Sequence, residues 1–205
     1  MTRTAPAELG KLETASPNAG IATTNVLRYR DGHGEPIRDA IAVEEPLEIR
    51  ISGDPLLVTM RTPGHDHELC AGLLLAEGMI GNRTDLSSIV HCGKVGEAGY
   101  GNTLDVTLAP GVTIDESRFE ARRGTTLNAA CGVCGRRTID DLMRDLQPLG
   151  EGPRFHASTL VALTDELRKQ QPNFDRTGGL HAAGIAAQGG ACRVVREDIG
   201  RHNAT

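Results

Sequence analysis

The sequence predicts an α+β protein, layered as in α/β folds, with a β-rich N-terminal part. Alternating polar and apolar residues recur in short runs typical of strands, and apolar residues at helical spacing mark three separate helices. The predicted order is strands, one helix, strands, two helices and strands, which indicates a layered domain. A chain of 205 residues is long enough for one large domain or one and a half.

The N-terminal part contains the first predicted strands. Residues 1–24 are rich in Ala, Thr, Pro and Glu without periodicity, so we expect a disordered tail. Alternation begins at Asn25, and the run Asp31-Gly32-His33-Gly34 turns the chain. A second alternating segment, 47–60, is divided by Ser52-Gly53-Asp54-Pro55 and predicts a β-hairpin. These elements open a β-rich part that we place at 25–115.

One helix and two further strands complete this N-terminal part. Residues 66–78 carry apolar side chains at helical spacing, with acidic residues in the first turn where the helix dipole favours anions. Gly78 is suited to end this helix. We expect that Asp66 and Glu68 serve this helix N-terminus. Strands are predicted at 88–92 and 103–108.

The second part, 116–205, begins with a loop of small residues that contains Cys131-Gly132-Val133-Cys134. A helix follows from Thr138, which suits an N-cap position. Another helix starts at Ser158 or Thr159 and ends before Pro172. Strands are predicted at 180–187 and 191–196, and residues 198–203 are expected to form a polar loop.

Composition excludes several functional classes. No run of apolar residues reaches the length of a membrane-spanning helix, and the first 20 residues lack the apolar core of a secretion signal. The net charge of −5 and the five aromatic residues argue against general nucleic-acid binding. Five cysteines, an odd number, without a secretion signal indicate reduced thiols and a cytoplasmic location.

The spacing Cys131-x-x-Cys134 is compatible with three kinds of site. A structural zinc site needs two further Cys or His ligands, and no second pair stands at ligand spacing. A thioredoxin-like redox pair usually follows a strand with aromatic residues, which is absent here. The third possibility is a reactive thiol that carries sulfur or a covalent intermediate. The remaining cysteines, Cys70 and Cys192, fit buried apolar positions, and Cys92 is ambiguous.

The surroundings of the pair favour the reactive thiol. Between Arg118 and Arg137 there are five arginines and one acidic residue, Glu120. Cations and a nearby helix N-terminus both lower the pKa of a thiol, so this segment favours the nucleophilic thiolate. The same positive charge would attract an anionic ligand.

Two further motifs contain polar residues beside predicted strands. His181 follows Thr177-Gly178-Gly179-Leu180 at the start of an apolar run, where a histidine is most often a core residue. Zinc deaminases use His-x-Glu, but Ala183 occupies the Glu position here, which disfavours deaminase chemistry. Residues 196–203 read Arg-Glu-Asp-Ile-Gly-Arg-His-Asn, a solvated loop or a ligand-binding loop.

Four motifs together resemble the FdhD family of sulfurtransferases, which serve formate dehydrogenase maturation. The resemblance covers about Val26 to Asn203. The motifs are Met60-Arg61-Thr62-Pro63-Gly64-His65-Asp66-His67-Glu68-Leu69 with Glu77-Gly78-Met79-Ile80, Cys131-Gly132-Val133-Cys134-Gly135, Thr177-Gly178-Gly179-Leu180-His181-Ala182-Ala183, and Arg196-Glu197-Asp198-Ile199-Gly200-Arg201-His202-Asn203.

The resemblance implies a mechanism and a set of site residues. Such proteins accept persulfide sulfur from a cysteine desulfurase and pass it to the molybdenum bis-molybdopterin guanine dinucleotide cofactor. Cys131 matches the persulfide-bearing residue and Cys134 matches its partner. The implied cofactor-binding positions are Arg61, His181, Asp198, Arg201, His202 and Asn203. No resident metal is implied.

The resemblance also implies a cytoplasmic homodimer that acts on formate dehydrogenase, with a cytidine-deaminase-like domain at 116–205. Family members continue past the Arg201-His202-Asn203 motif, so we expect this chain to be truncated at its C-terminal end. An alternative function is a non-catalytic chaperone that holds the molybdenum cofactor and uses its cysteines structurally or through zinc.

Overall fold

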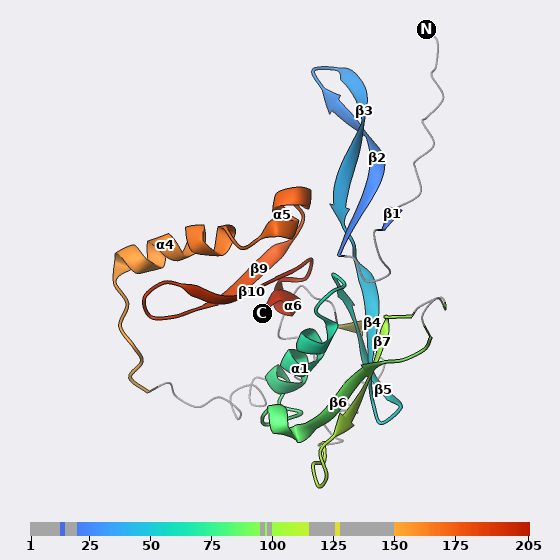
Figure 1. Ribbon diagram of the computed structural model, residues 1–205, viewed down its shortest axis with the longest axis vertical. Coiled ribbons are helices and arrows are strands. Elements are labelled where there is room, and N and C mark those ends of the chain that lie inside the picture. Colours follow the sequence, from blue (N-terminus) through green and yellow to red (C-terminus); the bar gives the residue numbers. More distant parts are fainter. Residues whose placement is uncertain (1–12, 15–19, 95–96, 98–99, 115–125, 128–149) are drawn as a thin grey trace.

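The computed structural model describes residues 13–14, 20–94, 97, 100–114, 126–127 and 150–205. The fold is α+β, as predicted, with several antiparallel strand pairs and short helices (Figure 1). The predicted helix from Thr138 and the cysteine pair lie outside the described residues. No helix in the described ranges is long and apolar enough to cross a membrane.

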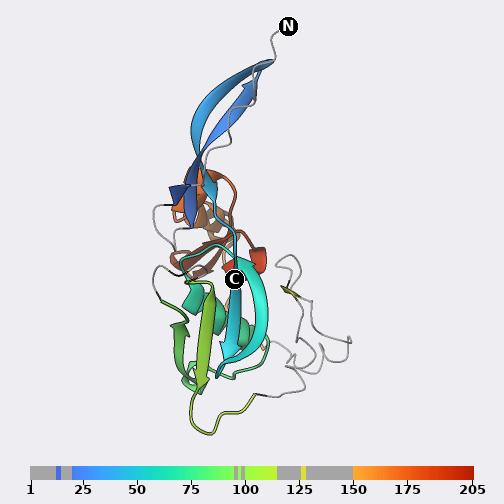
Figure 2. The same ribbon diagram turned by 90° about the vertical axis from the view of Figure 1, so that its right-hand side faces the viewer.

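A long two-stranded arm projects from the body of the molecule (Figures 1 and 2). Strand β2 (Ile21–Arg30) pairs with β3 (His33–Ala42), and the short β1 (Glu13–Thr14) pairs with the base of β2. Asp31 and Gly32 both have positive φ angles, 51° and 79°, as a tight hairpin turn requires. The expectation of a disordered tail at 1–24 is wrong at 13–14 and at 21–24, because these stretches pair with β2 and with the inner end of β3.

The main sheet has five strands in the order β6-β7-β4-β5-β8. The hairpin predicted at 47–60 is present as β4 and β5, with Ser52 and Gly53 in the turn. The bounds of the strands are β4 Glu45–Ile51, β5 Asp54–Arg61, β6 Leu86–His91, β7 Thr103–Leu108 and β8 Thr126–Leu127. Strand β8, from the predicted second part, thus joins the sheet of the first part, in parallel to β5.

Helix α1 (Asp66–Ala76) covers one face of this sheet, and the contact forms the core. Cys70 and Leu74 of the helix are completely buried against sheet residues such as Leu47 and Leu104. Burial of each such aliphatic side chain contributes about 2 kcal/mol. A short 3-10 helix, η1 (Arg83–Asp85), connects the end of this layer to β6 and is closed by a capping box.

Within residues 150–205 the structure has two strands and three helices: α4 Ala157–Arg168, α5 Pro172–Thr177, β9 His181–Ala186, β10 Cys192–Asp198 and α6 Arg201–Ala204. Strands β9 and β10 form an antiparallel pair, and α4 lies against both (Figure 1). A Cβ atom at Gly184 would lie 2.8 Å from Leu167 Cδ1, so glycine permits this close helix–strand contact.

Two helices in this part were not predicted. The preceding helix, α4, ends at Arg168, and Pro172 occupies the first turn of α5, where its missing N–H is no loss. The Glu197 carboxylate then accepts hydrogen bonds from the backbone N–H groups of Asn173 and Phe174. The polar loop predicted at 198–203 is wrong from residue 201 on, because Arg201–Ala204 form one turn of α-helix.

Candidate functional site

The predicted site residues other than the cysteines lie at the ends of three strands. Arg61 ends β5, His181 begins β9, and Asp198 ends β10 directly before α6. His181 and Asp198 are cross-strand partners. Arg201, His202 and Asn203 follow in α6. The structure therefore brings these positions together from segments that are more than one hundred residues apart.

The Asp198 carboxylate is the centre of this arrangement. It is buried and accepts hydrogen bonds from Thr62 N at 2.9 Å, from Gly200 N at 2.7 Å and from Asn203 Nδ2 at 3.1 Å. Burial raises the pKa of Asp198 above its usual value, and these hydrogen bonds and the nearby Arg61 charge oppose that rise. Asp198 is thus held in place by the backbone on two sides.

Two more hydrogen bonds join the same segments. The backbone N–H of Ile199 donates to Thr62 Oγ1 at 3.0 Å, and Asn203 Nδ2 donates to the Met60 carbonyl at 2.6 Å. Hydrogen bonds therefore connect the end of β5 to the segment at the start of α6, and each of the two segments contributes both donors and acceptors. Thr62, which was not among the predicted site residues, is central to this connection.

Arg61 forms a buried ion pair with Asp66. The Arg61 side chain is fully buried, and its Nε and Nη2 donate to the two Asp66 oxygens at 3.0 and 2.9 Å. Nη2 also donates to the Gly101 carbonyl at 2.9 Å. The guanidinium is thus occupied by partners within the chain, in a bidentate geometry that Lys could not reproduce. Asp66 serves this ion pair, in addition to lying in the first turn of α1 as expected.

Arg196 connects β10 to α1 through Glu68. Arg196 Nη2 donates to Glu68 Oε1 at 2.9 Å, and Arg196 Nε donates to the other carboxylate oxygen. This hydrogen bonding lowers the pKa of Glu68 below its usual value. The position of Glu68 in the first helical turn predicts a role at the helix N-terminus. No single-sequence pattern reveals its actual partner, 128 residues away.

The remaining predicted positions are accessible to a ligand. His181, Arg201 and His202 are exposed, whereas Arg61 and Asp198 are buried. The site therefore has a buried layer that fixes the backbone and an exposed layer with one arginine and two histidines. Arginine and protonated histidine bind phosphate and carboxylate groups through charge-assisted hydrogen bonds.

His91 was not predicted but lies beside the buried ion pair. Its Nε2 is 3.7 Å from Asp66 Oδ2, and its ring meets that of His67 edge-on at a centroid distance of 5.1 Å. Burial lowers the pKa of His91, and the neighbouring His67 and Arg61 charges lower it further, while Asp66 opposes the change. His91 is therefore poorly suited to carry a proton at neutral pH.

Strand β8 lies beside β5, shortly before the cysteines in the sequence. Leu127, the last residue of β8, pairs in parallel with Thr59, which precedes Arg61 by two residues. Cys131 follows Leu127 by four residues, a length of chain that spans at most about 14 Å. Both cysteines lie outside the described residues.

The described cysteines and acidic residues suggest no other reactive centre. Cys70 is buried in α1, and burial raises the pKa of its thiol to about 12, which keeps it protonated and inert. Cys92 and Cys192 are half-buried free thiols. Within the described ranges, no group of three or more His, Cys, Asp or Glu side chains is placed to hold a metal ion.

Comparison with solved structures shows the fold in a second protein. A structure from Desulfotalea psychrophila, described as a formate dehydrogenase accessory protein, superposes with a TM-score of 0.65 at 18% sequence identity. The match covers 90% of this chain and 65% of that one. At this identity the likeness establishes the shared fold.

Comparison with curated sequences gives closer relatives. The chain is 49% identical over 191 residues to a sulfur carrier protein FdhD of Anaeromyxobacter dehalogenans, and 45% identical over 174 residues to one of Mycobacterium tuberculosis. These matches cover 93% and 81% of this chain, and 65% and 62% of the relatives. The chain thus spans somewhat less than two thirds of their length. A sequence model of the FdhD/NarQ family matches residues 42–205, and the chain therefore belongs to this family.

Proposed function

We propose that the protein is a sulfur carrier that accepts persulfide sulfur at Cys131 and delivers it to a molybdenum cofactor for formate dehydrogenase. The observation that carries this proposal is the 49% identity to a relative named as a sulfur carrier protein FdhD. The position of Arg61 supports it, because Arg61 follows Thr59 by two residues and Thr59 pairs with Leu127 of β8, which precedes Cys131 by four residues in the sequence.

The loading step is a thiol–disulfide-type exchange. The Cys131 thiolate attacks the outer sulfur of a cysteine desulfurase persulfide, a new S–S bond forms on Cys131, and the desulfurase thiolate leaves. No net oxidation occurs in this step. Arginines close to Cys131 in the sequence, such as Arg136 and Arg137, favour the attacking thiolate.

The delivery step uses the second cysteine. The Cys134 thiolate attacks the inner sulfur of the Cys131 persulfide, which forms the Cys131–Cys134 disulfide and releases hydrosulfide. The cysteine pair thereby supplies the two electrons that reduce the transferred sulfur to sulfide. The sulfide replaces an oxygen ligand on the molybdenum of the bis-molybdopterin guanine dinucleotide, and that oxygen leaves as water.

The remaining residues bind or position the cofactor in this proposal. Arg201, His181 and His202 are exposed and would contact its diphosphate groups, which are anionic. Asp198 and Asn203 hold α6 in place, and Arg61 fixes the start of α1 through Asp66. We propose that the protein works in the cytoplasm, where the thiols that the mechanism needs stay reduced. We also propose that it works as a homodimer.

Intact-mass measurement tests the loading step. After incubation with a cysteine desulfurase and free cysteine, we expect a gain of one sulfur atom, which is reversed by a reductant. The variant Cys131→Ala should lose this gain, whereas Cys192→Ala, which removes a half-buried free thiol elsewhere, should keep it. Sulfur found on Cys192 or Cys92 instead would contradict the assignment.

Complementation tests the function as a whole. In cells that lack their own sulfur carrier, Cys131→Ala should fail to restore formate dehydrogenase activity. Restoration by this variant would overturn the persulfide mechanism and favour a chaperone that holds the cofactor without sulfur chemistry. Stoichiometric zinc in the purified protein would favour the same alternative, with structural cysteines.

A further inference from the structure

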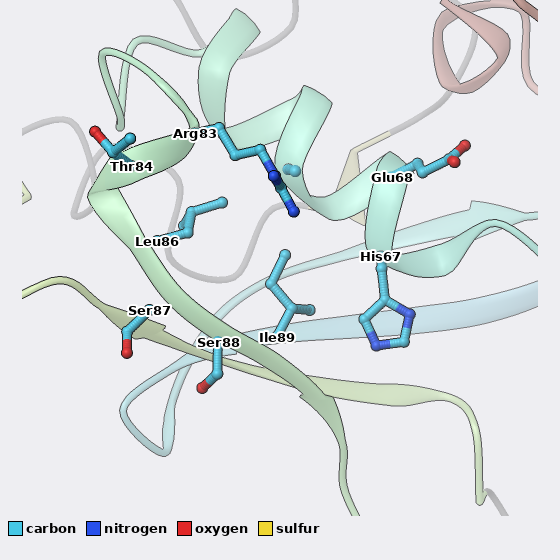
Figure 3. A pocket seen from close by; sticks show the side chains of 9 residues that line it. His67, Glu68, Arg83, Thr84, Leu86, Ser87, Ser88 and Ile89 are labelled. Atoms are coloured by element: carbon cyan, nitrogen blue, oxygen red, sulfur yellow. The ribbon is translucent and has the colours of Figure 1, made fainter.

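A groove of about 590 Å³ lies between α1 and β6, away from the predicted site residues. Its floor is apolar, formed by Ala71 of the helix with Leu86 and Ile89 of the strand (Figure 3). Arg83 extends from η1 into the groove, and His67 borders the opposite end. Arg83 and His67 are both exposed, so this apolar floor has a positively charged and polar border that solvent reaches.

Strand β6 is an edge of the five-stranded sheet. Cys92 N donates to the Thr103 carbonyl just past the end of β6, which fixes the alternation of the ladder with β7. By that alternation the backbone groups of Ser88 and Val90 face β7, and those of Ile89 and His91 point outward. Among the described strands none pairs with this edge of β6, so its outward N–H and C=O groups are available to pair with an added strand.

The charges around the groove favour an acidic ligand. Arg83 has no ion-pair or hydrogen-bond partner among the described side chains, and Figure 3 shows its guanidinium over the groove. Glu68 also borders the groove, but it points away and is neutralised by Arg196. The groove therefore presents an uncompensated cation above an apolar floor, next to a strand edge.

We propose that this groove binds an extended peptide segment of a partner protein as an added strand beside β6. Main-chain hydrogen bonds to Ile89 and His91 would supply affinity, as in other cases of strand addition between an edge strand and a helix. Alternate side chains of the peptide face α1, so apolar ones contact Leu86 and Ile89. An acidic peptide side chain between the two apolar side chains pairs with Arg83. This proposal does not depend on the sulfur-carrier function.

A short designed peptide provides the probe. In acetyl-Val-Thr-Glu-Thr-Val-Thr, the two valines and the glutamate share one face and match the apolar floor and Arg83. Fluorescence anisotropy with the labelled peptide should show saturable binding to the full chain. Replacing the glutamate by glutamine should weaken binding about tenfold, as expected for the loss of one charge-assisted hydrogen bond.

Two variants locate the peptide. Arg83→Gln should weaken binding of the glutamate peptide about tenfold. It should not change binding of the glutamine peptide, because that peptide forms no ion pair with Arg83. Val90→Lys alters the exposed side chain next to Ile89 on the other face of β6 and should leave binding unchanged. Arg83 is exposed, so its replacement should not impair folding.

Amide hydrogen exchange tests the strand pairing itself. Bound peptide should protect the amides of Ile89 and His91, while Val90, which already donates to β7, should change little. Absence of saturable binding at millimolar peptide would overturn the proposal. So would equal binding of both peptides, or binding without protection of Ile89 and His91.

Discussion

Asp198 accepts a hydrogen bond from the backbone N–H of Thr62 at 2.9 Å, across 136 residues of sequence. The next residue after Asp198 makes a second hydrogen bond to the same threonine, because Ile199 N donates to Thr62 Oγ1. Two sequence motifs that both belong to the family resemblance are thus joined physically at the ends of β5 and β10. The contact explains why a polar stretch after β10 is ordered as α6.

Removal of the Asp198 carboxylate should destabilise the protein strongly. Asp198→Ala leaves the N–H groups of Thr62 and Gly200 buried without acceptors, which should lower the free energy of unfolding by about 3 kcal/mol. Urea denaturation monitored by circular dichroism measures this. The matched change Asp165→Ala, at an exposed position of α4, should alter the free energy by less than about 0.5 kcal/mol. If both substitutions lowered the free energy of unfolding equally, the hydrogen bonds at Asp198 would contribute no more to stability than an exposed carboxylate does.

The Arg61–Asp66 ion pair should show strong coupling. Arg61→Met alone leaves the buried Asp66 charge unpaired and should cost about 3–5 kcal/mol of unfolding free energy. The double variant Arg61→Met with Asp66→Leu removes both charges and should recover part of that loss. Additive losses in this double-mutant cycle would mean that the two side chains act independently.

His91 should make the protein less stable as the pH falls below neutrality. Its folded pKa lies below the usual 6.5, mainly because of burial, so the unfolded chain binds the proton first. The free energy of unfolding therefore decreases as the pH drops from 6.5 through the folded pKa. His91→Gln should flatten this dependence at pH values below about 7. An unchanged slope in the variant would assign the effect to another group.

The sequence predicted regular elements well where periodicity was strong. The helix that begins at Asp66 and the hairpin of β4 and β5 are confirmed, because apolar spacing and turn residues specify them locally. Strand β3 and helix α5 were missed. Pro36 within β3 and Pro172 at the start of α5 signal interruption in a sequence, yet an edge strand and a first helical turn both tolerate proline.

The site could be predicted only as a set of positions. The motifs identified Arg61, Asp198 and Asn203 but not their partners. Some of the bonds join distant segments or involve the backbone. The two side-chain bonds over five residues, Arg61–Asp66 and Asp198–Asn203, depend on how the end of a strand meets the helix that follows it. Asp66 and Glu68 illustrate this: both fit a helix N-terminus, where acidic residues are common. The fold instead pairs them with Arg61 and Arg196. A single sequence contains no record of these pairings.

Gly178 should tolerate substitution less well than its neighbour Gly179. Gly178 ends α5 with a φ angle of 67°, in the left-handed region where a Cβ atom causes strain, so Gly178→Ala should cost about 1 kcal/mol. A Cβ atom at Gly179 would make only an ordinary contact, 3.8 Å from Ala42 Cβ, so Gly179→Ala should be nearly neutral. Gly178→Asn should recover part of the loss, because Asn adopts this conformation more readily. The melting temperatures of the three variants measure the order of their stabilities. If Gly179→Ala lowered the melting temperature more than Gly178→Ala, the left-handed cap would not be the reason for glycine in this motif.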